Sequence, residues 1–137
     1  MPGHDAYGKR VLAAATGGRA AQFGPAVEVH YGVGLPARID GCVGGMIAVE
    51  LESRVSKQVR GAVLDLICHD CPKKLLALLP VHMNPVVTAD QCRKILARFC
   101  QADCFRVVIL TGSGENPRVE EDAAILGAAL KELGAAL

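Results

Sequence analysis

Residues 37–52 most constrain the fold, because they predict a β-hairpin that carries acidic side chains. Two apolar stretches are joined by Gly44 and Gly45, a pair typical of tight hairpin turns. Side chains alternate between the faces of a strand, so Glu50 and Glu52 share one face. Two carboxylates ~4 Å apart repel each other by ~4 kcal/mol at an effective dielectric constant of ~20. This arrangement favours a bound cation, and a divalent metal is the usual choice.

Asp40 lies in the first arm of the same hairpin, and its direction depends on the length of the turn. A two-residue turn at Gly44 and Gly45 directs Asp40 away from Glu50. A three-residue turn or a β-bulge shifts the register by one residue and brings Asp40 onto the acidic face. We expect this shift, because the glycines distort at low cost. The simpler alternative is that Glu50 and Glu52 line a solvated strand face.

Composition sets the outer limits. The chain has 137 residues, which predicts one domain. Hydrophobic residues make up 51% and charged residues 21%, a balance that argues against disorder. We see no apolar run that could cross a bilayer and no secretory signal, which favours a cytoplasmic protein without a membrane partner. The net charge of +1 neither indicates nor excludes nucleic-acid binding, and 4% aromatics disfavour a platform on which single-stranded bases stack.

The hydrophobic pattern predicts an alternation of helices and strands along the whole chain. We expect strands at 27–33, 39–43, 46–52, 75–79 and 107–110, and helices at 6–15, after residue 53, after a capping box at Thr88 and Gln91, and after residue 114. This order predicts an α/β fold with a mixed sheet. An antiparallel three-strand meander is extended by parallel α/β crossovers, with helices on both faces. The single domain of residues 1–137 has a core at about 6–80 and an α/β extension at about 81–137.

The arrangement of residues 6–80 resembles the PD-(D/E)XK nuclease superfamily, whose fold is called restriction-endonuclease-like. Asp40 matches the Asp of the family, although the usual preceding Pro is absent, and Glu50 matches the first acid of the (D/E)XK element. Glu52 stands where the family usually has Lys, although some restriction endonucleases of the superfamily also have Glu there. Lys57 is the nearest substitute for that Lys, with Gln58 as a second polar candidate.

The resemblance implies a nuclease that hydrolyses the phosphodiester bonds of DNA with Mg²⁺ or Mn²⁺. Asp40, Glu50 and the carbonyl of Leu51 are the implied metal ligands. Glu52 or Lys57 is implied to orient the water or stabilise charge. A further family acid often comes from the first helix, where this chain offers Asp5, and Glu28 on the first predicted strand is an alternative.

Two further implications concern partners and activity. Many nucleases of this kind act as dimers, because one site cuts one strand, so a homodimer is implied. The missing Lys at position 52 favours an alternative, in which the fold is a catalytically inactive module that binds nucleic acid or another protein.

A basic stripe follows the acidic strand. Arg54, Lys57 and Arg60 are spaced by three and fall, together with Gln58, near the start of the predicted helix. Next to an acidic metal site, these side chains can hold a phosphate backbone. The alternative is an ordinary solvated helix face.

The cysteines and one glycine-rich loop leave several interpretations open. Cys68, Cys71, Cys100 and Cys104 lie where helices turn into strands, and four thiolates at one sheet edge can hold Zn²⁺. Buried free thiols are a simpler interpretation, and local disulfides are a third. Residues 111–116 follow a strand and precede a helix, a context that can cradle a phosphate in a nucleotide-binding domain or form a plain loop.

Overall fold

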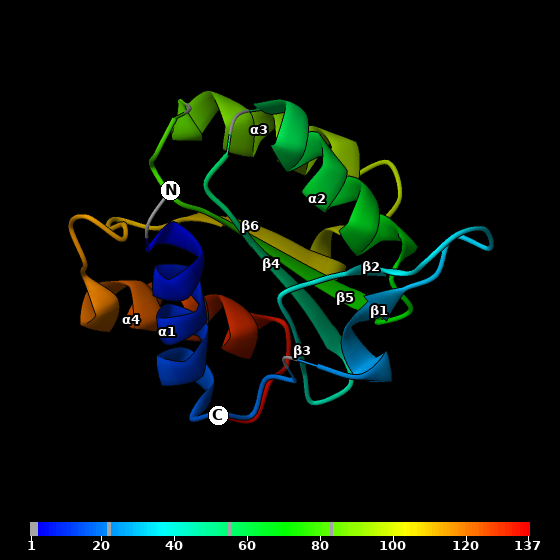
Figure 1. Cartoon of the computed structure of the whole chain (residues 1–137), viewed down its shortest axis with the longest axis horizontal. Helices are drawn as coiled ribbons and strands as arrows, with labels where there is room; N and C mark the ends of the chain where they lie inside the picture. Colours follow the sequence, from blue (N-terminus) through cyan, green and yellow to red (C-terminus); the bar gives the residue numbers. More distant parts are fainter. Residues whose placement is uncertain (1–2, 22, 55, 83) are drawn as a thin grey trace.

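A computed structural model describes residues 3–21, 23–54, 56–82 and 84–137. Its helices are α1 (His4–Thr16), α2 (Ser56–Cys68), α3 (Pro85–Leu96) and α4 (Val119–Glu132), with short 3₁₀ turns at Pro25–Val27 and Ala102–Cys104. The main sheet contains β3 (Gly41–Val43), β4 (Ile47–Glu52), β5 (Lys73–Leu78) and β6 (Phe105–Ile109). α2 and α3 cover one face of this sheet, and α1 and α4 cover the other (Figure 1). The predicted layers, with helices on both faces, are confirmed.

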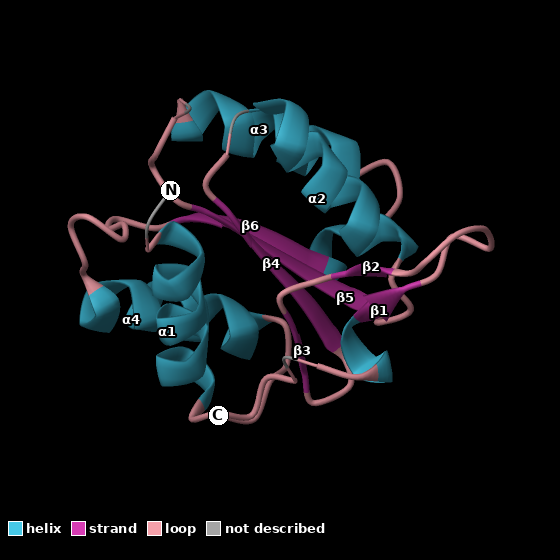
Figure 2. Cartoon of the chain, viewed as in Figure 1, coloured by secondary structure: helices cyan, strands magenta, loops and turns pink. Residues whose placement is uncertain are grey.

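The main sheet has the strand order β3-β4-β5-β6 (Figure 2). β3 runs antiparallel to β4, whereas β5 and β6 are added in parallel. α2 connects β4 to β5, and α3 connects β5 to β6, so a crossover helix joins each parallel pair. The mixed α/β sheet is therefore confirmed, and α3, β6 and α4 follow residue 80.

Side-chain alternation along the strands creates two apolar cores, one on each face of the sheet. On β4, Ala48 packs into the core under α2 and α3, and Val49 packs into the core under α1 and α4. Glu50 and Glu52 continue the alternation of Ala48, so both acids lie on the α2 side of the sheet. β5 is buried on both faces, as expected of an interior parallel strand.

The expected strand at 27–33 is mostly wrong. Only β1 (Glu28–Val29) is extended and paired, and it forms a separate two-stranded sheet with β2 (Ala37–Arg38). Gly32 and Gly34 have φ angles of +88° and +71°, left-handed values that interrupt a strand. The antiparallel three-strand meander is therefore divided into two small hairpins, with Asp40 between β2 and β3.

The predicted start of the third helix is also wrong. α3 begins at Pro85, and the Asn84 side chain accepts hydrogen bonds from the N–H groups of Val86 and Val87. Thr88 is buried inside the helix rather than capping it. Asn followed by Pro is the stronger start signal, because Pro suits the first helical turn and Asn is a preferred cap.

Candidate functional site

The hairpin between β3 and β4 fixes the relation between the acidic side chains. Val43 pairs with Ile47, so the turn contains three residues, of which Gly44 and Gly45 have φ angles of +60° and +67°. These left-handed angles suit glycine. The predicted one-residue shift is confirmed, and it places Asp40 next to Glu50 rather than on the opposite face.

Asp40 and Glu50 hold each other through the backbone of the hairpin. The Asp40 N–H donates to Glu50 Oε1 at 2.9 Å, and the Leu51 N–H donates to Asp40 Oδ2 at 2.7 Å. Glu50 is only 8% exposed, and Asp40 is half-buried. The two carboxyl groups are thus fixed side by side with little contact to water.

Burial raises the pKa values of both carboxyl groups. Burial, reinforced by the negative charge of Asp40 and a hydrogen bond to it, raises the pKa of Glu50 to about 10. Burial also raises the pKa of Asp40, against the opposing hydrogen bond from Leu51. At neutral pH the pair therefore retains a proton that a cation would displace.

Glu52 has a different environment, although it lies two residues further along the same face. The Nε and Nη2 atoms of Arg54 donate to Glu52 Oε1 and Oε2 at 2.7 and 2.9 Å, and the Arg54 N–H donates at 3.0 Å. The hydrogen bonds and the charge of Glu52 raise the pKa of Arg54. Where the PD-(D/E)XK pattern usually has Lys, this chain therefore has a carboxylate paired with a guanidinium.

These acids line one cavity of about 410 Å³ between α1, β4 and α2. The predicted site residues in its wall are Asp40, Glu50, Leu51, Glu52, Arg54 and Gln58. The first-helix candidate Asp5 also lines it. Carboxylates from three segments of the chain therefore meet cationic side chains in a single hollow.

Three predicted residues lie elsewhere. Lys57 and Arg60 are exposed and do not line this cavity. Arg60 instead borders a hollow of about 350 Å³ between α2 and α3. Glu28, the other candidate for the additional acid, faces Arg38 at 3.9 Å and His30 at 3.7 Å. The basic stripe is thus split, with Arg54 and Gln58 on the cavity side.

The sequence patterns did not identify three other residues that line the cavity, Lys9, Arg38 and Asp65. Lys9 follows Asp5 by four positions on α1, and Asp65 follows Gln58 by seven positions on α2. These spacings place each pair on one helix face, so the spacing could have predicted that Lys9 and Asp65 lie beside Asp5 and Gln58. The Tyr31 hydroxyl donates a hydrogen bond to Asp65.

The donor chemistry of the cavity suits a hard cation. No cluster of at least three His, Cys, Asp or Glu side chains is arranged to hold a metal ion within the described parts of the chain. Mg²⁺ needs fewer, because it is often bound by one or two carboxylates and keeps several waters. Asp40, Glu50 and the Leu51 carbonyl are such oxygen donors in the wall of the cavity.

The cysteines do not gather in the way that the zinc interpretation requires. All six are free, and Cys68 is exposed whereas Cys71 is buried. Cys71 Sγ lies 3.0 Å from Cys42 Sγ, so its neighbour is a cysteine outside the proposed zinc set of Cys68, Cys71, Cys100 and Cys104. Burial raises the pKa of Cys71 to about 12, which keeps it a thiol.

The loop at residues 111–116 uses its N–H groups internally. Those of Thr111 and Gly112 donate to Asp122 at 2.7 and 2.9 Å, and that of Gly114 donates to His4 at 3.1 Å. A phosphate would have to displace these partners. The loop is therefore a structural connection between β6 and α4.

No protein-family model, curated protein or solved structure matches this chain. No helix within the described ranges is long and apolar enough to span a membrane. The case for a function therefore depends on the geometry of the acidic cavity.

Proposed function

We propose that this protein is a metal-dependent nuclease of the PD-(D/E)XK type that hydrolyses phosphodiester bonds of DNA. The observation that carries the proposal is the buried Asp40–Glu50 pair, whose pKa values are both raised, in a cavity that is also lined by basic side chains. Buried acids with strongly shifted pKa values in a cleft are typical of functional sites.

The order of elements supports the same proposal. The family pattern is a helix, three strands, a helix and a strand, and residues 6–80 keep the helix, the acidic hairpin, the second helix and the parallel strand, although the expected three-strand meander is divided into two small hairpins. Structural ion networks also shift pKa values, so the topology adds an argument that is independent of the electrostatics.

Each side chain has a proposed role. Asp40, Glu50 and the Leu51 carbonyl hold Mg²⁺ or Mn²⁺, which when bound supplies an activated water and stabilises charge on the phosphate. Arg54 fixes Glu52 at the edge of the cavity, where its carboxylate can accept a proton from water. Lys9 and Arg54 line the cavity, so they are better placed than Lys57 to contact the scissile phosphate.

DNA cleavage tests the proposal directly. Purified protein with Mn²⁺ or Mg²⁺ is expected to nick plasmid DNA, and Glu50→Gln is expected to lower the rate by roughly 10²-fold or more. Glu120→Gln is a matched control, because Glu120 is exposed on α4, and it should leave the rate unchanged. Equal activity in wild type and Glu50→Gln would refute the site.

The inactive module is the second candidate, and the Glu52–Arg54 pair favours it, because a carboxylate occupies the usual position of Lys. This alternative predicts DNA or protein binding that is independent of divalent cations, with no cleavage.

The nuclease proposal includes a homodimer, which lets two sites cut two strands. Light scattering after size-exclusion chromatography, with and without DNA, measures that state.

A further inference from the structure

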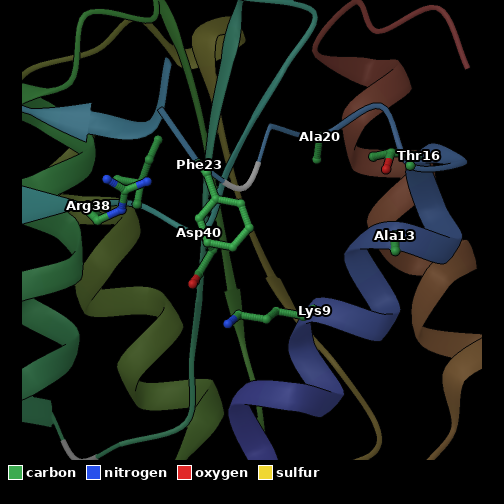
Figure 3. A pocket seen from close by; sticks show the side chains of 9 residues that line it. Lys9, Ala13, Thr16, Ala20, Phe23, Arg38 and Asp40 are labelled. Atoms are coloured by element: carbon green, nitrogen blue, oxygen red, sulfur yellow. The ribbon is translucent and has the colours of Figure 1, made fainter. Parts of the chain in front are cut away.

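A second hollow of about 460 Å³ adjoins the acidic cavity (Figure 3). The two hollows share Lys9, Arg38 and Asp40, so they adjoin beside Asp40. Away from this border the wall becomes apolar, with Ala20 and Phe23 on one side and α1 on the other. A ligand that spans both hollows would meet charge at one end and hydrocarbon at the other.

Phe23 is the distinctive group in this wall. It lies in the loop that leads from α1 to β1, and its side chain is 81% exposed. An aromatic ring left in water beside a hollow offers a flat apolar surface that the fold itself does not cover. In Figure 3 the ring projects toward the space between Arg38 and Lys9.

The charges at the border narrow the choice of ligand. Lys9 is exposed, and among the residues that the structure describes Arg38 makes one long ion pair, of 3.9 Å to Glu28, so both cations are available to an anion. One anionic group joined to one flat, apolar ring system is the chemistry of a nucleotide, whose phosphate suits the cations and whose base suits the ring.

We infer that the hollow beside Phe23 takes the base of an unpaired nucleotide, so that the preferred substrate is single-stranded or locally unpaired DNA. The inference rests on the proposed function, because the acidic cavity is taken to hold the adjoining phosphate. A base inside a duplex is stacked and paired, and it reaches such a wall only by leaving the stack. The low aromatic content disfavours a platform for successive bases, but one base needs only one ring.

Binding without cleavage tests the inference. Fluorescence anisotropy with a short single-stranded oligonucleotide, in a chelating buffer, gives the affinity of each variant, and 2-aminopurine in the oligonucleotide reports stacking. Phe23→Ala is expected to weaken binding by about 5- to 150-fold, and Phe23→Tyr to restore it. Phe99→Ala is the matched control, because Phe99 is 65% exposed outside this hollow. Phe23→Ala and wild type should bind blunt duplex DNA with equal affinity.

The results separate this inference from the proposed nuclease. If Phe23→Ala binds and cleaves single strands like wild type, the base hollow is refuted and the nuclease stands. If no variant cleaves DNA, but single-strand binding and the 2-aminopurine signal are lost in Phe23→Ala, the hollow stands and the nuclease falls. Failure of wild type to bind single-stranded DNA at micromolar concentrations would overturn the inference, whatever its activity on duplexes.

Discussion

Glu50 and Asp122 are both buried carboxyl groups, but the fold treats them in opposite ways. Asp122 is fully buried, yet it accepts hydrogen bonds from the Tyr7 hydroxyl, from the N–H and hydroxyl of Thr111, and from the Gly112 N–H. Burial alone would raise the pKa of Asp122, but these bonds outweigh burial and lower it. Glu50 faces a second acid instead, and burial with that charge raises its pKa to about 10.

The difference distinguishes a carboxylate that is surrounded by hydrogen-bond donors from one that faces a second acid. Asp122 ties α4 to α1 and to the loop after β6, and its charge is stabilised by protein donors alone. Glu50 is buried in the wall of the acidic cavity, and its raised pKa favours the protonated form at neutral pH. A buried acid with a strongly raised pKa in a cleft is characteristic of ligand and metal sites.

Replacing Asp122 should have the largest effect on stability. Asp122→Asn replaces one of the two acceptor oxygens by an NH2 group, so either the donors of Thr111 or those of Gly112 and Tyr7 lose their acceptor. We expect a loss of roughly 3 kcal/mol in the free energy of unfolding. Urea denaturation at pH 7 measures it, with Glu120→Gln on the same helix as the control. An unchanged midpoint would show that Asp122 is not a structural carboxylate and would break the comparison.

Replacing Glu50 should change stability in the opposite direction. Glu50→Gln removes the need to keep a carboxyl group protonated, so we expect a gain of about 1–2 kcal/mol at pH 8 in the presence of a chelator. The folded pKa lies above the ordinary value of 4.5, so the stability that Glu50 contributes is present below about 4.5 and is lost as pH rises toward about 10.

The pH dependence sharpens the contrast. The gain from Glu50→Gln should shrink as pH falls through 4.5, because below that pH the wild-type group becomes neutral in both states. Asp122 has a lowered pKa, so its contribution is present above its ordinary value of 3.8 and is lost as pH falls through the folded pKa. Destabilisation by Glu50→Gln at pH 8 without metal would contradict our account of the acid pair.

The smallest effects are expected outside the cavity. Lys57→Ala and Arg60→Ala should each lower the salt dependence of DNA binding by about one phosphate contact and leave cleavage at saturating DNA unchanged. Lys9→Met, inside the cavity, should lower cleavage itself. If Lys57→Ala slowed cleavage at saturating DNA, Lys57 would be the residue that takes the catalytic role of the lysine in the (D/E)XK element.

Local patterns predicted the fold best where periodicity and turn chemistry agree. The run of buried residues in β5 and the glycine turn before β4 gave the strand types and the register. The stretch after Val29 alternates like a strand, but its glycines adopt left-handed angles, and sequence alternation alone does not exclude them. Thr88 matched a capping box, yet Asn84 and Pro85 start the helix one turn earlier.

The candidate site was predicted only as far as neighbours along the chain determine it. Asp40, Glu50 and Glu52 belong to one hairpin, so their meeting follows from register. Lys9 and Asp65 reach the cavity because α1 and α2, which pack on opposite faces of the sheet, both contribute to its wall, and this depends on long-range packing. The pairing of Arg54 with Glu52 depends on rotamers that spacing does not reveal.

Calorimetric titration with Mn²⁺ at pH 7 tests the central claim most directly, that the Asp40–Glu50 pair is completed by a divalent cation. Wild type is expected to bind Mn²⁺ and to release about one proton, detected as heats that differ between buffers of different ionisation enthalpy. Glu50→Gln is expected to lose both the binding and the proton release. Equal binding in Glu50→Gln, or binding in wild type without proton release, would contradict the account.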